Sequence, residues 1–177
     1  MPLFEEGRIP AGVYTGHEGI FETTASLHRN VSGFVEVRYG DFFSGQRLRV
    51  WTRIDWRPNR FGRIGFEYDH NELWIDLERD LGPSGAPTGT KIVDARIRSR
   101  VARIRLNVQF TPDISWLTFV QYDNVSDQVG VNSRLRWMVE DGREIFIVFN
   151  QTLLALDGDI RNGVTEPLAK VGWTLRF

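Results

Sequence analysis

The sequence predicts an all-β fold, an antiparallel up-and-down meander of about nine strands that is either a transmembrane β-barrel or the C-terminal segment of a larger barrel. Three observations predict it. Apolar and polar residues alternate through most of the chain, which is the period of a strand, and helical spacing is rare. Turn-forming segments separate the alternating runs. The last nine residues alternate without interruption and end on the aromatic Phe177.

The alternation places the first strands in order along the chain. A first run covers 19–29, and 34–40 alternates next. Residues 47–57 then carry apolar side chains mainly at even positions and arginine at most odd ones. Pro58 and Asn59 end this run, because proline cannot donate to a central ladder and asparagine tolerates unusual backbone angles.

Two long runs, 61–77 and 91–110, each change phase once. In the first, apolar residues move to the other face near Asn71. One extra residue in a strand produces such a change, so we expect a β-bulge there. The glycines and prolines between the two runs predict a long loop at 78–89.

The remaining strands are shorter. Runs at 114–122, 129–139 and 145–154 alternate and are separated by polar or glycine-containing turns. A second long loop is expected at 155–163, and the terminal strand follows it.

The terminal strand has one apolar and one polar face, because successive side chains of a strand point to opposite sides. It resembles the C-terminal strand of bacterial outer-membrane barrels, which the barrel-assembly machinery reads through a final aromatic and apolar residues at every second position. That resemblance implies the assembly machinery and outer-membrane lipid as partners. The last strand of a soluble β-sandwich would alternate in the same way. The residues of the implied assembly signal are Ala169, Val171, Gly172, Trp173, Leu175 and Phe177.

Length and composition restrict the class of protein. The 177 residues suit a single domain, 1–177, in which 1–18 is an N-terminal extension. A net charge of −1 gives no reason to expect nucleic acid as a partner. Cysteine is absent, which excludes disulfides and thiolate metal sites. No apolar run is long enough for a transmembrane helix, but the strands of a barrel escape that test.

The N-terminus shows no basic segment followed by an apolar stretch, so a secretory signal peptide is not recognised. An outer-membrane protein requires one for export. We therefore expect this chain to be part of a longer precursor that reaches the outer membrane of a Gram-negative bacterium.

The expected connections form two sets of different length. If the C-terminus is periplasmic, every second connection counted back from it is periplasmic too, and these four are the shortest. The opposite set includes 78–89 and 155–163, which we expect to be extracellular. Outer-membrane barrels show this asymmetry. The four short connections are 140–143, 111–113, 58–59 and 30–33.

Arginine outnumbers lysine by 20 to 2 and is frequent on the polar faces of the strands. Arginine forms bidentate pairs with carboxylates, and the same strands carry several. They are Glu36, Asp55, Glu67, Asp69 and Asp94. We expect a structural salt network inside a polar lumen, because unpaired interior charge is costly; the functional alternative is a positively lined pore that favours anions. The candidate lumen-lining residues are Arg38, Arg49, Arg53, Asp55, Arg96, Arg98, Arg103, Arg105, Arg134 and Arg136.

Most of the tryptophans and two tyrosines lie toward strand ends, as the aromatic girdles of membrane proteins do. Hydrophobic core is the alternative location for each of them. They are Trp51, Trp56, Trp74, Trp116, Trp137, Trp173, Tyr68 and Tyr122.

Four groups of segments resemble a Gram-negative outer-membrane β-barrel domain of unknown function that is found behind a family 9-like carbohydrate-binding module. The resemblance covers the C-terminal part of that barrel. It implies that upstream barrel strands and the binding module are missing partners, and that transport or surface glycan handling is the associated role. The segments are 3–5 with 9–14, 40–45, 103–107 with 110–113, and 119–124 with 132–137 and 146–150.

No arrangement typical of catalysis or metal binding is present. Asp69 and His70 with Asp76 or Ser133 would be the nearest to a hydrolase site, but neighbours in a strand point to opposite faces and no nucleophile elbow occurs. We expect no catalytic, cofactor-binding or metal-binding residue and no enzymatic activity. The histidines, which lack metal-ligand spacing, are His17, His28 and His70.

Three functional hypotheses follow. The first is an outer-membrane barrel segment, which uses all of these features. The second is a soluble all-β module that binds a ligand or carbohydrate and needs no detergent. The third is an outer-membrane hydrolase, which would require clustered Asp, His and Ser side chains.

Overall fold

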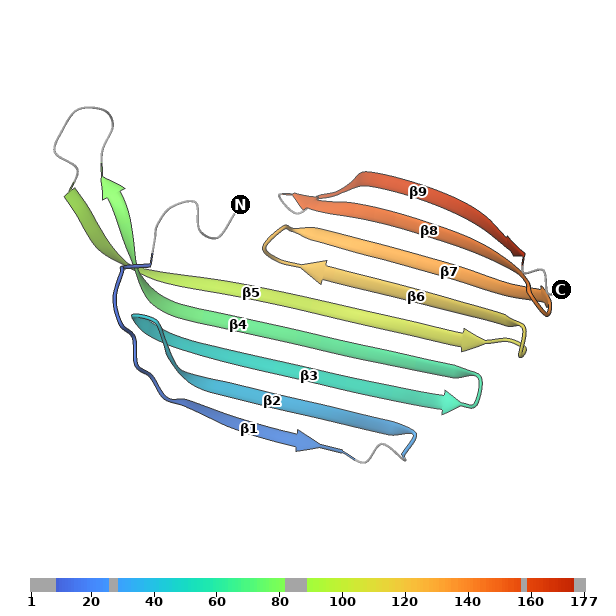
Figure 1. Cartoon of the computed structure of the whole chain (residues 1–177), viewed down its shortest axis with the longest axis horizontal. Coiled ribbons are helices and arrows are strands. Elements are labelled where there is room, and N and C mark those ends of the chain that lie inside the picture. Colours follow the sequence, from blue (N-terminus) through green and yellow to red (C-terminus); the bar gives the residue numbers. More distant parts are fainter. Residues whose placement is uncertain (1–8, 26–28, 82–88, 157–158, 174–177) are drawn as a thin grey trace.

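The chain folds as one antiparallel sheet in which each strand pairs with the next (Figure 1). The computed structural model describes residues 9–25, 29–81, 89–156 and 159–173. The all-β meander is confirmed, and the described residues contain no helix. The nine strands are β1 (Glu18–Thr24), β2 (Val31–Phe42), β3 (Gly45–Asn59), β4 (Gly62–Leu81), β5 (Gly89–Gln109), β6 (Ile114–Asp123), β7 (Gln128–Glu140), β8 (Arg143–Leu156) and β9 (Asp159–Trp173).

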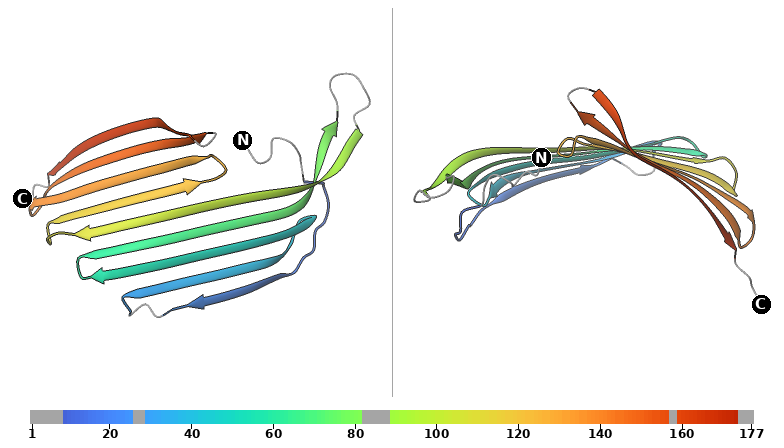
Figure 2. Two further views of the ribbon diagram at one scale, coloured as in Figure 1. Left: turned by 180° about the vertical axis from the view of Figure 1, so that it is seen from behind. Right: turned by 90° about the horizontal axis from the view of Figure 1, so that it is seen from above.

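The sheet is open and curved. In the described residues β1 pairs only with β2 and β9 only with β8, so closure into a barrel is not observed. Figure 2 shows the curvature from the side. We call the end of the sheet where β9 reaches Trp173 the proximal end, and the opposite end, with the β4–β5 hairpin, the distal end (Figure 1).

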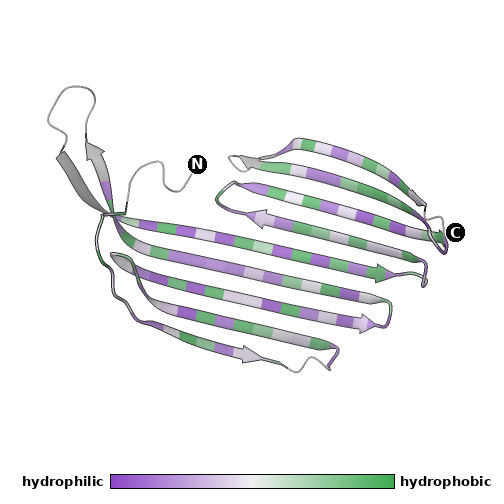
Figure 3. Cartoon of the chain, viewed as in Figure 1, coloured by the Kyte–Doolittle hydropathy of each residue, from purple (hydrophilic) through white to green (hydrophobic). Residues whose placement is uncertain are grey.

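Hydrophilic and hydrophobic residues alternate along much of the sheet (Figure 3), which places them on opposite faces. Residues opposite each other in paired strands share a face. The row Trp56, Ile64 and Leu106 defines face A, and the row Glu36 and Trp51 defines face B. This register determines which predicted residues can meet.

The expected bulge near Asn71 does not occur. Strands β4 and β5 pair without a register shift from Gly62 opposite Val108 to Leu81 opposite Gly89. Instead, the apolar residues move from one face of the strand to the other while the pairing stays regular. Beyond Asn71 face B becomes apolar and face A becomes charged, while the backbone continues unchanged.

A small hydrophobic core explains the exchange. Ile75, Leu77 and Ile97 are buried on face B at the distal end, and Ile9 of the N-terminal segment packs against them. Ile9, within the predicted N-terminal extension 1–18, thus contacts the core on face B. Phe42, Leu73 and Ala95 also contact the core.

Parts of the two predicted long loops belong to strands. Residues 78–81 and 89 belong to β4 and β5, while 155–156 and 159–163 belong to β8 and β9; 82–88 and 157–158 lie outside the described residues. Strand extension therefore contributes to the asymmetry between the two ends. The β4–β5 hairpin passes beyond the last pairs that β4 makes with β3 and β5 makes with β6.

Candidate functional site

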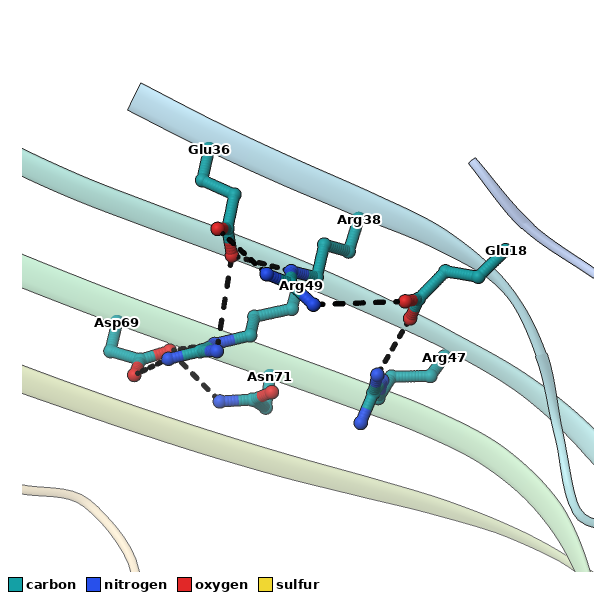
Figure 4. Close-up of polar contacts among 7 residues, drawn as sticks. All are labelled: Glu18, Glu36, Arg38, Arg47, Arg49, Asp69 and Asn71. Atoms are coloured by element: carbon teal, nitrogen blue, oxygen red, sulfur yellow. Dashed lines mark hydrogen bonds and ion pairs between the residues drawn. The ribbon is translucent and has the colours of Figure 1, made fainter. Parts of the chain in front are cut away.

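A network of arginines and carboxylates crosses face B from β1 to β4 (Figure 4). Glu36 accepts two hydrogen bonds from Arg38, at 2.7 Å from Nε and 3.0 Å from Nη2. Arg49 donates to both carboxylate oxygens of Asp69, at 3.2 and 2.9 Å, and Asn71 donates to the same carboxylate at 2.9 Å. Fork geometry of this kind favours arginine over lysine.

Cross-strand contacts extend this network to its neighbours. The Nη1 atom of Arg49 lies 3.9 Å from Glu36, which joins the two bidentate pairs. Glu18 on β1 contacts Arg47 at 2.6 Å and Arg38 at 3.9 Å. The charges of four adjacent strands therefore form one connected cluster.

Further pairs occupy the middle and proximal parts of face B. Arg53 contacts Asp55 at 2.9 Å. Glu67 binds Arg103 at 2.6 Å and Arg105 at 3.3 Å from the neighbouring strand. One carboxylate again serves two guanidinium groups.

Arginines of β7 face β8 across the same surface. Arg136 binds Glu144 at 2.9 Å. Both Arg134 and Arg136 lie over the ring of Phe146, at 5.8 and 5.9 Å from its centroid. Charged side chains on face B thus make contacts on strands from β1 to β8, in separate groups.

The register brings together eight of the ten residues predicted to line a lumen. Arg96 and Arg98 lie on face A, because the polarity of β5 inverts where we expected only a local irregularity. The eight on face B are Arg38, Arg49, Arg53, Asp55, Arg103, Arg105, Arg134 and Arg136.

Most of the carboxylates predicted to pair with arginine do so. Glu36, Asp55, Glu67 and Asp69 each bind arginine. Asp94 instead lies opposite another aspartate. Glu18, Glu72 and Glu144 also bind arginine and were not predicted, because their partners come from other strands and depend on the register.

A second charged cluster lies on face A at the distal end. The side chain of Glu72 is 9% exposed and contacts Arg96 at 2.5 Å and Arg98 at 2.9 Å. His70 approaches the other oxygen of Glu72 at 3.5 Å, and Arg96 lies 5.8 Å from the centroid of the Trp74 ring. These side chains come from β4 and β5 alone.

Two aspartates face each other farther along the same hairpin. Asp76 lies opposite Asp94. A hydrogen bond from the shared proton to Asp94, together with burial and like-charge repulsion, raises the pKa of Asp76 above its ordinary value.

A pocket with a different lining lies over β6–β9. Its volume is about 500 Å³ and most of its lining side chains are uncharged hydrogen-bonding groups. Asn132 donates to Asn150 within it, and Gly130 leaves open space where a side chain would project. The other polar lining residues are Gln121, Asp123, Ser126, Gln128, Gln151, Thr152 and Glu166.

The predicted assembly signal falls partly within the described residues. Ala169, Val171 and Trp173 lie on face A of β9, and Gly172 lies on face B opposite Glu144. The side chain of Trp173 packs under Arg143, whose Cζ is 4.1 Å from the ring centroid. Leu175 and Phe177 lie outside the described residues.

The residues considered for catalysis do not gather. Asp69 and His70 lie on opposite faces, and Ser133 accepts a hydrogen bond from the indole of Trp116 at 2.8 Å. Within the described part of the chain, no group of three or more His, Cys, Asp or Glu side chains is placed to hold a metal ion.

No described helix has the length and apolar character needed to cross a membrane. Comparison with known protein families, curated proteins and solved structures finds no match.

Proposed function

We propose that this chain forms part of the wall of an outer-membrane β-barrel, with face A toward lipid and face B toward a charged interior. The observation that carries the proposal is an apolar band on face A. Its spans are about nine residues long, close to the ~9–11 residues that a tilted strand needs to cross a bilayer. The apolar band comprises the face A side chains of 31–39, 48–56, 102–110 and 129–137.

The apolar band crosses the sheet obliquely. Trp56 and Leu106 lie in one row of the register, yet the band ends proximally at Trp56 on β3 and only at Phe110 after β5. Strands of a closed barrel tilt by about 35–45° against the barrel axis. A membrane layer perpendicular to that axis would produce this oblique course.

Aromatic side chains border the apolar band at both ends. At the proximal end Trp56, Trp137 and Trp173 are exposed on face A, and at the distal end Tyr39 and Tyr122 are exposed. Belts of this kind mark the two interfaces of membrane proteins. Trp51 is different, since it lies on face B and packs against Phe34 at a centroid distance of 5.0 Å.

The directions of the two edge strands determine how the sheet can close into a barrel. In an alternating sheet of nine strands, β1 and β9 run the same way, so joining them directly would create a parallel pair. Single-chain bacterial barrels have an even number of antiparallel strands. We place an odd number of additional strands, from upstream in the same polypeptide, between the edges of β1 and β9.

The chemistry of face B favours a structural interior over an open anion pore. Most of its described arginines are matched with carboxylates, and shared pairs such as Arg103–Glu67–Arg105 link adjacent strands. Matched charge fills an interior without the cost of unpaired ions. The chain would thus serve as a scaffold for transport or surface glycan handling, without enzymatic activity of its own.

Refolding tests the proposal. The full chain is unfolded in denaturant, transferred to detergent or liposomes, and compared by circular dichroism and by gel mobility with and without heating. We expect a β-rich species that needs detergent and whose mobility changes on heating. A β-rich monomer that is stable in water without detergent would contradict the membrane assignment and support the soluble module.

A second candidate function is binding of an uncharged polar ligand, carbohydrate included, in the pocket over β6–β9. Amide side chains supply donors and acceptors together, which suits hydroxyl groups. No lining residue of this pocket is basic. A glycan array probed with the refolded chain tests it; binding to neutral glycans that is lost in Gly130→Leu would support the pocket.

A further inference from the structure

Three arginines project from the same side of β5 just beyond the apolar band. Arg96, Arg98 and Arg100 occupy alternate positions and therefore share face A, and Ala102 is the first apolar residue that follows them. Strand β4 pairs with β5 along this part, whereas β6 pairs with β5 only from Val101 onward, so the other side of β5 has no paired strand here.

The arginines are held in position by hydrogen bonds, but their guanidinium groups keep N–H donors for a ligand. Arg96 and Arg98 both bind the same oxygen of Glu72, although their side chains remain 57% and 39% exposed. A guanidinium has five N–H donors, so one shared carboxylate oxygen occupies only a minority of them. The main chain of Arg100 is fixed by Asn124, which accepts from its N–H and donates to its carbonyl oxygen at 3.2 Å.

The cluster carries an excess of positive charge. Among the described residues Glu72 is the carboxylate that binds it, and His70 lies beside the same carboxylate. Farther along the hairpin Asp76 and Asp94 lie opposite each other on the same face. Arg96 and Arg98 thus share one carboxylate, and the three arginines outnumber the carboxylates bound to them in the described part of the chain.

We propose that Arg96, Arg98 and Arg100 bind the phosphate groups of a lipid in the leaflet at the distal end. This inference rests on the proposed membrane function. Guanidinium groups bind phosphate oxygens in bidentate geometry, and basic clusters next to a membrane-spanning segment recognise anionic headgroups.

The surroundings of the cluster match the headgroup region. Trp74 lies beside Arg96, and Tyr68 packs against His70 at 6.2 Å between ring centroids. Amphipathic rings of this kind occupy the layer between lipid tails and water. The acyl chains of the bound lipid would lie along the apolar band below, over Ile104 and Phe66.

The test compares lipids that differ only in phosphate. The full chain is refolded in detergent and titrated with diphosphorylated, monophosphorylated and dephosphorylated lipid A, and separately with inorganic phosphate. We expect affinity to fall with each phosphate removed. The variant R96Q/R98Q/R100Q should bind the diphosphorylated form at least tenfold more weakly, while R57Q/R60Q/R63Q, with the same change of charge at the proximal end, should bind it normally.

A lysine variant controls for the possibility that the glutamine variant loses binding because it misfolds. R96K/R98K/R100K retains the charge but not the fork, and we expect an affinity between those of wild type and the glutamine variant. If the heat-dependent gel shift is present but phosphorylated and dephosphorylated lipids bind alike, this proposal is wrong while the membrane function stands. Equal binding of inorganic phosphate would also overturn it, in favour of a free anion. A chain that never associates with detergent would overturn both.

Discussion

Glu36 is held between Arg38 and Arg49 on face B, 2.7 Å from the Nε of the first and 3.9 Å from the Nη1 of the second. Its side chain is 7% exposed, so this carboxylate is among the least accessible charges described in the network. Strands β2 and β3 would lose this shared ionic contact if it were neutral. Substitution of Glu36 therefore tests whether the network on face B stabilises the fold.

We expect Glu36→Gln to lower the temperature at which the refolded chain loses its heat-dependent gel shift. The amide cannot neutralise two guanidinium groups, and both arginines would remain without that counter-charge. Glu144→Gln is the matched control, because that carboxylate is 36% exposed and binds Arg136 near the proximal end. An equal effect of the two substitutions would show that Glu36 has no central role.

The two faces of the sheet predict opposite responses to a new charge. Ile104 lies in the middle of the apolar band and is 48% exposed. In a membrane, Ile104→Arg should destabilise the folded chain by about 2–4 kcal/mol, whereas on a water-facing surface it should be nearly neutral. Leu117→Arg on face B serves as the control with the smaller expected effect. Unfolding by urea in detergent and in liposomes measures both.

The sequence predicted the strand order and the chemistry of face B, because alternation and residue type are local properties. It could not distinguish a bulge near Asn71 from an exchange of polarity, since both shift apolar residues by one position. Which of the two occurs depends on contacts with Ile9, which is far away in sequence and packs against Ile75 and Leu77. For the same reason Glu72 was not predicted to bind arginine, since its partners Arg96 and Arg98 lie on the next strand.

The Asp76–Asp94 pair predicts a pH dependence of the β4–β5 hairpin. The raised pKa of Asp76 means that folding favours its protonated form. The contribution is therefore complete at pH below the ordinary aspartate value and is lost as pH rises through the raised pKa. Hydrogen exchange corrected for intrinsic rates should show the hairpin amides better protected in acid than at neutral pH.

Asp76→Asn should remove this dependence and strengthen the hairpin at neutral pH, since an amide can donate to Asp94 at every pH. Asp55→Asn, near the proximal end, should leave the hairpin unchanged. Hairpin protection that rises with pH in the unsubstituted chain would contradict the assigned direction.

Two glycines of the sheet should respond oppositely to the same added methyl group. A Cβ at Gly45 would overlap the carbonyl oxygen of Trp74 and lie 2.9 Å from the Cα of Ile75, whereas a Cβ at Gly130 would meet nothing within 4 Å. Replacing glycine by alanine where the backbone permits it stabilises by about 0.4–1 kcal/mol through the unfolded state. We therefore expect Gly130→Ala to raise stability and Gly45→Ala to lower it.

The overlap at Gly45 involves backbone atoms, which cannot move aside as a flexible side chain can. Relief requires the β2–β3 turn to separate from β4, and Phe42, adjacent to that turn, contacts the distal core. The loss should therefore exceed the gain at Gly130 and should appear as faster hydrogen exchange in β4 near Ile75. Unchanged exchange there, with both variants equally stable in urea, would mean that the turn does not press against β4.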